Sequence, residues 1–542
     1  MFFPENRLCS ESFGPVSFLE YLISDAVKCT IDAVNSNRAM KIIATLFTCL
    51  CFGVTVTSSA AVKIPPVLKA GVARVDISRV AARPSANTLY AKALVLNLGE
   101  TTAILVTLDA VAVGEIGSIK NDFLPAVRAR LKKELGIEPA NVLINASHCH
   151  GSVHPDVEAR TVQAVREAMR KMAPVHAGTG IGFENRIMEN RRLILKNGRQ
   201  LDVRHAYSLP PDEDVAAVGP VDPEIGILRL DDSNGNPLAV VYNFAMHPIQ
   251  GTPLTAGDTA DVVGFASKVI EDNLGGAMAL FLQGCGGDIN PALYKDVSNP
   301  RDAEPLGNLL GLSVLQAVRK IPTHDQVDLR IVNHVIQVPR ADHSKRIAEM
   351  ELEKERLLKS LRGTSLNLKT FYELRMKYGV NGDFPSYYSH RYLNEAKIGR
   401  ENLKKLDEEN RRNLEAYTRN IHTMEELTRL LINQALLEKH QARNAAAEMK
   451  PVAAEVVGLR VGDFRLVTFP GEVTVPIGLN IKRASPHAAT FVAGYSNGYL
   501  YYCPTAEQMK NVGRAQEDSD SLLAPGWQKI FEDKAAEILK GL

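Results

Sequence analysis

The chain has 542 residues, of which 45% are hydrophobic and 23% are charged, and its formal net charge is +1. This length is sufficient for more than one domain, or for one large domain with insertions. The near-neutral charge balance gives no electrostatic reason to bind a polyanion, so we expect no nucleic-acid partner.

A targeting segment is predicted at residues 40–61. Met40-Lys41 precedes an apolar run that ends at Val56, and small residues follow as far as Ala61. A short basic start, an apolar stretch and a small-residue exit are the three parts of a secretory signal peptide. The run is shorter than the ~20 apolar residues of a membrane span, and a short anchor or a buried helix is the alternative. We therefore expect a secreted or periplasmic protein, with residues 1–39 an upstream extension of the reading frame.

Four of the seven cysteines would be lost with that segment, which leaves Cys149, Cys285 and Cys503. An odd number of cysteines does not make a disulfide framework. We expect these three to be small, buried packing residues.

Predicted strands and helices alternate along most of the chain. Strands are expected at residues 67–78, 91–98, 102–109, 142–144, 175–179, 225–230, 238–244, 277–282 and 327–338, and helices at 121–135, 156–172, 265–273 and 305–320. Residues 182–223 are expected to be loop-like, with turn-forming dipeptides such as Pro210-Pro211. The alternation predicts an α/β fold in which a layered, mixed sheet core is flanked by helices.

Residues 344–450 differ in composition and predict a long helical insertion. They are rich in Glu, Lys, Arg, Leu and Asn, with a break near residues 379–385. The charge runs are expected on solvated helix faces, and no heptad is sustained long enough to indicate a coiled coil. Strands are expected again at 452–461, 464–469 and 490–493, before a closing helix at 527–539.

Three predicted strands each lead to a residue type that binds metals. The strand at 142–144 leads to His148-Cys-His150, the strand at 238–244 to His247, and the strand at 464–469 to Glu472. Ligands of open α/β sheets bind beyond the carboxyl ends of the strands. Two imidazoles and a carboxylate are a ligand set of catalytic zinc that leaves a position for water or substrate. The alternatives are histidines that fill a polar turn and a Glu472 that caps a helix.

The order of the motifs resembles the neutral/alkaline (non-lysosomal) ceramidase family, a group of secreted zinc amidases. The resemblance extends over about residues 67–542 and rests on His148-x-His150, Asn243-Phe-Ala-Met-His247-Pro, Gly287-Asp-Ile-Asn-Pro291, Phe469-Pro-Gly-Glu472 and Asn497-x-Tyr-x-x-Tyr502. It implies hydrolysis of the amide that joins a fatty acid to a sphingoid base. It also implies that residues 62–542 are a ceramidase-like catalytic domain, with 344–450 as its helical insertion.

Position by position, the resemblance implies that zinc is held by His148, His247, Glu472 and Tyr502. Tyr499 and Tyr501 are nearby alternatives to Tyr502.

The resemblance also implies the residues that handle the substrate. His150 falls where the family has a second histidine that contacts substrate, and Arg191 matches a substrate-binding arginine, with Arg192 as the alternative. Asp261 matches an acidic position that either orients a ligand or assists proton transfer.

Several positions depart from the family pattern. Asn290 stands where the ceramidases have a serine proposed as the nucleophile, and an amide cannot become a nucleophile, although it can donate hydrogen bonds to an oxyanion. We therefore expect direct attack by zinc-bound water. The other departures are Gly151-Ser-Val-His154 in place of Ser-Gly-Pro-Gly, Arg514 near a family tyrosine, and an expected lack of the C-terminal immunoglobulin-like domain.

Together these features predict a secreted zinc-dependent hydrolase that cleaves an amide (N-acyl) bond in a small molecule or lipid. Sphingolipids are among the candidate substrates. The departures bear on ceramide as substrate more than on the metal. One alternative is a catalytically degenerate protein that binds zinc or lipid, and another is a metallohydrolase for an ester or a cell-wall amide. For the helical insertion we weigh three roles: a lid, a transient membrane-surface contact and a scaffold.

Overall fold

The computed structural model describes residues 66–79, 88–202, 210, 212–251, 259–294, 301–385, 389–511 and 515–542. The predicted upstream extension and signal peptide (residues 1–61) and Arg514 lie outside the described residues. Contacts group Pro66–Leu542 into one unit, and the description below concerns that unit. Within the described ranges, none of the helices combines the length and apolar composition that crossing a membrane requires.

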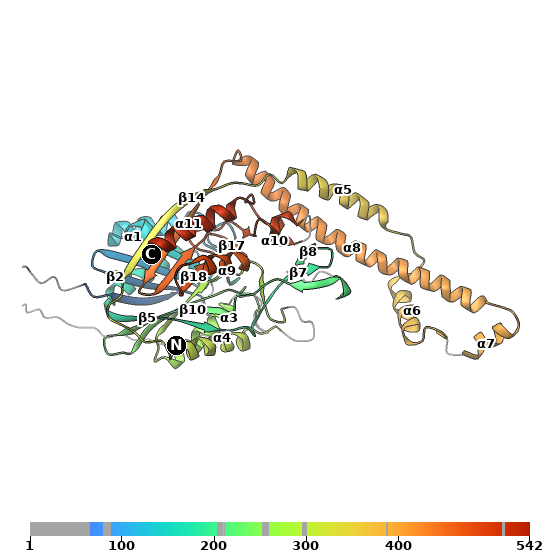
Figure 1. Ribbon diagram of the computed structural model, residues 1–542, viewed down its shortest axis with the longest axis horizontal. Coiled ribbons are helices and arrows are strands. Elements are labelled where there is room, and N and C mark those ends of the chain that lie inside the picture. The colour runs from blue at the N-terminus through green and yellow to red at the C-terminus, as the bar shows by residue number, and fades with distance from the viewer. Residues whose placement is uncertain are drawn as a thin grey trace, which may run out of the picture. The chain divides into compact units, whose positions relative to one another are not determined.

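The largest element of the fold is an eight-stranded mixed sheet (Figure 1). In sheet order the strands are β12 (Met278–Gln283), β11 (Pro237–Phe244), β10 (Glu224–Asp232), β5 (Ala173–Phe183), β1 (Lys69–Asp76), β2 (Tyr90–Leu98), β3 (Thr101–Leu108) and β4 (Val142–Ala146). The pairs β3–β4 and β11–β12 are parallel, and the other neighbouring strands are antiparallel.

A four-stranded sheet packs against the larger one. Its strands in order are β14 (Leu329–Val338), β15 (Val452–Val461), β16 (Phe464–Thr468) and β18 (Thr490–Ala493). Leu94 and Leu96 of β2 join a buried cluster with residues of the smaller sheet, such as Phe491. The alternate residues Ala93 and Val95 join a second cluster. Successive strand side chains point to opposite faces, so the apolar run Ala93–Leu96 is buried because both faces of β2 are covered.

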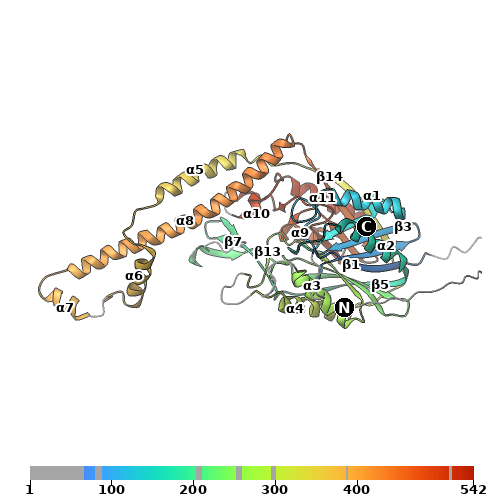
Figure 2. The ribbon, with the colours of Figure 1, turned by 180° about the vertical axis from the view of Figure 1, so that it is seen from behind.

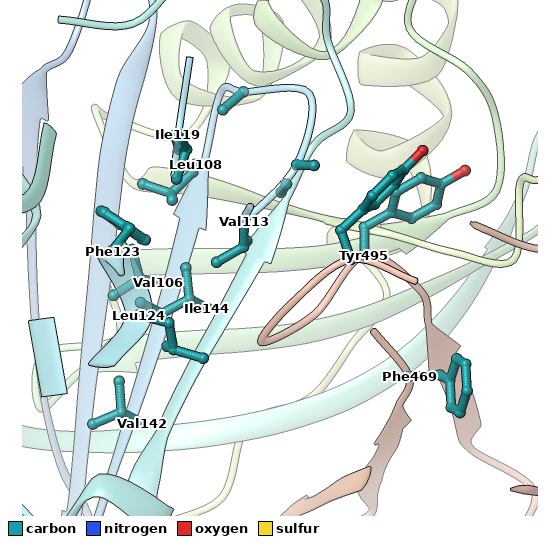
Figure 3. Close-up of a cluster of buried hydrophobic side chains, with 14 of the residues drawn as sticks. Val106, Leu108, Val113, Ile119, Phe123, Leu124, Val142, Ile144, Phe469 and Tyr495 are labelled. Atoms are coloured by element: carbon teal, nitrogen blue, oxygen red, sulfur yellow. The ribbon is translucent and has the colours of Figure 1, made fainter. Parts of the chain in front are cut away.

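Helices cover the outer faces of both sheets. Figure 3 shows Phe123 and Leu124 of α1 beside Val106 and Ile144 of the large sheet, in a cluster of buried apolar side chains. The covering helices are α1 (Phe123–Leu135), α2 (Val157–Arg170), α3 (Asp261–Asn273) and α4 (Ala303–Val318) on the large sheet, and α9 (Val475–Ala484) and α11 (Trp527–Gly541) on the small one. The predicted α/β class, with a layered mixed sheet core flanked by helices, is confirmed.

The predicted helical insertion is also confirmed, and its break lies between α6 and α7. Its helices are α5 (Ser344–Ser360), α6 (Leu368–Val380), α7 (Ser389–Lys397) and α8 (Asn402–Ala446). Figures 1 and 2 show α8 running from the layered sheets to α6 and α7, with α5 alongside the part near the sheets.

The prediction that residues 182–223 are loop-like is wrong. They contain the short strands β6 (Met188–Asn190), β7 (Arg192–Leu195), β8 (Gln200–Asp202) and β9 (Val215–Val218). β7 pairs with β8 and β9, while β6 pairs with β13 (Ile289–Pro291). Strands of three or four residues are too short to show a readable alternation. The β6–β13 pair matters for the site, because it brings Arg191 beside Asn290.

Candidate metal centre

Three side chains from the ends of separate strands meet in the interior. His148 follows β4, His247 follows β11, and Glu472 begins the short strand β17 (Glu472–Val473) after β16. All three are buried, and one potential ligand atom from each lies within 4.8 Å of the other two. The predicted convergence of these residues is therefore confirmed.

The separations in this cluster fit a single small cation. Glu472 Oε2 lies 3.1 Å from His247 Nε2 and 3.4 Å from His148 Nε2. The hydroxyl of Tyr502 lies 3.4 Å from His247 Nε2. A tetrahedral zinc with bonds of about 2.0–2.1 Å separates neighbouring ligand atoms by about 3.3 Å. These three separations are those expected between neighbouring ligands of one zinc ion.

The imidazole rings are held in the tautomer that metal binding needs. His148 Nδ1 lies 2.7 Å from the carbonyl oxygen of Val111, and His247 Nδ1 lies 2.8 Å from that of Ile289. A carbonyl only accepts, so each Nδ1 carries the proton and each Nε2 presents a lone pair to the cluster. Burial lowers the pKa of His148 to about 4, which keeps that ring neutral. The Nε2 lone pairs and the carboxylate oxygen repel one another unless a cation lies between them, so this set of donor atoms fits zinc.

His148 has an unusual backbone conformation. Its φ is 68°, in the left-handed region that a non-glycine residue adopts at an energetic cost. Its amide donates to the carbonyl of Ala110, in the segment that follows β3. Strain at a turn that presents an imidazole to the cluster is consistent with a functional constraint.

The tyrosines beside Glu472 differ in their partners. Tyr499 donates to Glu472 Oε1, and Tyr495 donates to Oε2 at 3.2 Å. Burial, followed by the charge of Glu472, raises the pKa of both phenols, so both stay protonated as donors. Tyr501 donates to Glu115 instead. Tyr502, the predicted ligand, is the candidate whose hydroxyl lies beside a cluster imidazole, and its role as a ligand stays a prediction.

Arg191 is buried beside the cluster and fully engaged. Its Nη2 donates to the carbonyl of Gly287 at 2.6 Å and to the Tyr502 hydroxyl at 3.2 Å. Its Nε donates to Glu517 at 2.6 Å. The alternative, Arg192, pairs with Asp518 at 2.7 Å and does not line the cavity described below. Of the two arginines, Arg191 is the one that lines the cavity, and its substrate-binding role stays a prediction.

Asn290 has a contact that differs from its predicted role. Its amide oxygen accepts a hydrogen bond from Arg191 Nη1 at 3.2 Å. The side chain is buried, and Asn290 is not among the residues that line the cavity. Its observed partner is thus the arginine, where we had expected a substrate oxyanion.

Asp261 opens α3 and holds the loop that follows His247. Its carboxylate accepts from the backbone amides of Gly251 at 2.6 Å, Gln250 at 3.2 Å and Val262 at 2.8 Å. Burial raises its pKa. These contacts favour the predicted orienting role over proton transfer, because both carboxylate oxygens are already engaged by the backbone.

The cluster opens into a cavity of about 390 Å³. His150 is exposed and lines it, with its ring centroid 5.5 Å from that of His148. Lys439 of α8 also lines the cavity, so the helical insertion contributes to its wall. Other lining residues include Ile116, Pro248, Ile249, Tyr294, Arg301, Tyr501 and Asp520.

Two further residues at the site had not been identified from the sequence. Glu517 of α10 (Gln516–Ser519) is fully buried against Arg191, and Lys439 lies 3.7 Å from Asp520. Neither residue has a sequence pattern that marks it, because Glu517 is one of two adjacent acidic residues in a short helix and Lys439 is one of many charged residues in α8. The buried thiols of Cys149, Cys285 and Cys503 are free, as expected.

No protein-family model matches the chain, and no curated protein matches its sequence. Solved structures do match. A ceramidase complexed with C2 aligns with a TM-score of 0.54, and a neutral ceramidase from Pseudomonas aeruginosa aligns with a TM-score of 0.53. Each is 16% identical, and each alignment covers 88% of this chain and 75% of the other. The chain therefore has the fold of the neutral ceramidases, in agreement with the resemblance of its motifs.

Proposed function

We propose that this chain is a secreted or periplasmic zinc-dependent hydrolase of an amide (N-acyl) bond. The observation that carries the proposal is the buried cluster of His148, His247 and Glu472, with both imidazoles in the metal-binding tautomer and a cavity above them. The ceramidase fold supports the same reaction class. The solved ceramidase complexed with C2 supports an N-acyl lipid as the kind of substrate.

In this proposal the metal is held by His148, His247, Glu472 and Tyr502. Zinc bound there would polarise a carbonyl and lower the pKa of a water molecule. Tyr495 and Tyr499 fix the orientation of the Glu472 carboxylate through their hydroxyls. A ligand fixed in this way does not have to reorganise during the reaction.

The substrate would be oriented by Arg191 and would exchange protons with His150. Burial lowers the pKa of Arg191, but Tyr502 and Glu517 together raise it by more, so Arg191 stays cationic. A fixed cation beside the reacting carbonyl stabilises the negative charge that develops on its oxygen. His150 has room in the cavity to accept a proton and return it to the leaving amine, as imidazoles do in general acid–base catalysis.

No covalent acyl intermediate is expected. Asn290 replaces the family serine, and no serine or cysteine occurs among the described residues that line the cavity. Burial raises the pKa of Cys149 to about 12, so this neighbour of the cluster is held as the unreactive thiol.

Zinc removal and substrate matching test the proposal together. Purified protein should contain zinc and hydrolyse an N-acyl amide. A chelator should abolish turnover, and added zinc should restore it. The amide is compared with an ester of the same acyl chain. Zinc binding with no turnover of either compound would establish the degenerate binding protein, whereas turnover of the ester alone would establish an esterase.

Substitution of Asn290 separates its two candidate roles. Asn290→Asp keeps an oxygen that can accept from Arg191 but removes the amide donor, whereas Asn290→Ala removes both. If Asn290 positions Arg191, the aspartate variant should retain most of its kcat/KM. The alanine variant should lose about 10–100-fold, as expected for a hydrogen bond to a charged group. An oxyanion donor would instead make both variants slow by about 10²–10³-fold in kcat.

A further inference from the structure

The helix α6 carries apolar side chains on two faces, and one face has a partner within the chain. On that face the ring of Phe371 stacks on Tyr417 of α8, with centroids 4.7 Å apart. Tyr378 donates to Asp407 of α8 at 2.8 Å. These contacts fix which side of α6 faces α8.

The other face presents a continuous apolar stripe to solvent. Leu368, Tyr372, Met376 and Val380 follow one another at intervals of four residues, which places them along one side of the helix. Their exposed fractions are 56%, 63%, 73% and 83%. Single exposed apolar residues are ordinary, but a contiguous stripe marks an interaction surface. We call these four residues the α6 stripe.

The stripe lies in the part of the insertion farthest along α8 from the layered sheets (Figures 1 and 2). Leu393 of α7 and Ile398 just after it are 60% and 56% exposed, so large apolar side chains recur there. None of these six residues lines the cavity of the metal centre. The surface is therefore separate from the residues that line the cavity.

The segment that carries the stripe is rich in basic residues. From Leu368 to Arg400, across α6 and α7, there are six lysines and arginines but three aspartates and glutamates, whereas the whole chain has a net charge of only +1. The exposed members of this basic set include Lys369, Arg375, Arg391, Lys397 and Arg400. The segment that carries the α6 stripe thus has an excess of positive charge.

We propose that the α6 stripe and its basic surroundings dock onto an anionic lipid surface. Apolar side chains on a helix that lies in the plane of a membrane enter the boundary between headgroups and acyl chains. Lysines and arginines around them contact the lipid phosphates, and tyrosine is favoured at this interface. The apolar stripe and the basic residues of this segment match these two requirements.

A second copy of the chain fits this surface less well. A symmetric dimer would place the same patch of both subunits face to face. The basic residues around the two stripes would then repel each other, with no excess of acidic residues in the same segment to offset them. An anionic membrane supplies the opposite charge directly.

Vesicle sedimentation tests the docking surface without any assay of hydrolysis. Wild-type protein is mixed with vesicles of phosphatidylcholine alone or of phosphatidylcholine with phosphatidylserine. We expect binding to the anionic vesicles that weakens as salt is raised. The triple variant Tyr372→Ser/Met376→Ser/Val380→Ser should bind at least about tenfold more weakly, because three apolar side chains no longer enter the interface. Leu312→Ser, at a 55% exposed leucine on α4, is the matched control and should bind as the wild type does.

Three results would overturn the proposal. In the first, wild-type protein binds neither kind of vesicle. In the second, the triple variant binds anionic vesicles as well as Leu312→Ser does. In the third, wild-type protein binds no vesicles and forms a dimer that the triple variant cannot form. Circular dichroism shows whether each variant is folded. The variant His247→Ala should still bind vesicles, because docking does not depend on the metal. A failed hydrolase proposal is therefore distinguishable from a failed docking surface.

Discussion

Replacement of His247 by alanine is expected to abolish metal binding and hydrolysis together. The ring contributes an unprotonated Nε2 that lies 3.1 Å from Glu472 Oε2 and 3.4 Å from the Tyr502 hydroxyl, so its loss removes one of the three candidate ligands of the cluster. Loss of a contact that only orients a metal ligand costs about 10–100-fold in affinity or activity. Loss of the ligand itself should exceed this. Elemental analysis after gel filtration should find only traces of zinc, and turnover of the N-acyl substrate should disappear.

The matched control is His154→Ala, at a partly exposed histidine in the same loop as His148. Its Nδ1 accepts from the backbone amide of Asp156 at 3.1 Å and takes no part in the cluster. This variant should keep its zinc and its activity. A His247→Ala protein that is folded and retains its zinc would show that the cluster is not the metal centre.

The sequence is most informative where a residue follows a long apolar strand. β4, β11 and β16 are buried strands whose hydrophobic runs are easily read, and each is followed within a few residues by a candidate ligand. The carboxyl ends of such strands are where α/β folds place their ligands. For this reason His148, His247 and Glu472 could be identified as a converging set before their distances were known.

Partners that are remote in the sequence could not be predicted in this way. Arg191 and Glu517 are 326 positions apart and meet through strands and a helix of three or four residues each. Asn290 illustrates the same limit. Its identity departs from the serine that the resemblance implies at this position, but only the structure shows that its oxygen faces Arg191.

The helical insertion shows what composition alone leaves open. Its charged and leucine-rich pattern predicts helices, and four helices form. The pattern does not show that Lys439 lines the cavity, because its partner Asp520 belongs to a distant segment. It also does not show which apolar face of α6 is covered. Phe371 packs on α8 whereas the neighbouring Tyr372 is exposed, and only the structure shows this difference.

The substitution Glu517→Gln is expected to destabilise the protein and to impair catalysis while the metal is retained. Glu517 is fully buried, and its carboxylate pairs with Arg191 at 2.6 Å and with Arg192 at 3.4 Å. Removal of one partner from a buried ion pair typically costs about 3–5 kcal/mol, because the remaining charge has lost its compensation. Burial and the charge of Glu517 raise the pKa of the nearby Asp202. Loss of Glu517 should ease the ionisation of Asp202, which offsets part of the cost.

The effect on activity follows from the position of Arg191. Its Nε would lose the carboxylate that orients the guanidinium between Gly287 and Tyr502, so kcat/KM should fall. None of the candidate ligands in the metal cluster is changed, so the zinc content should stay at the wild-type level. A fall in activity that simply tracks lost zinc would contradict this account of Arg191.

The control for this substitution is Glu507→Gln, at an exposed glutamate that pairs with Lys510 at 2.7 Å. Exposed ion pairs contribute little to stability, because water and salt screen them. This variant should therefore unfold at the same denaturant concentration as the wild type, whereas Glu517→Gln should unfold well below it. If both variants unfold at the same denaturant concentration as the wild type, the buried ion pair does not hold α10 against Arg191. A positional effect on catalysis would then have to come through another contact, and Asn290 is the remaining side chain that accepts from the Arg191 guanidinium beside Tyr502.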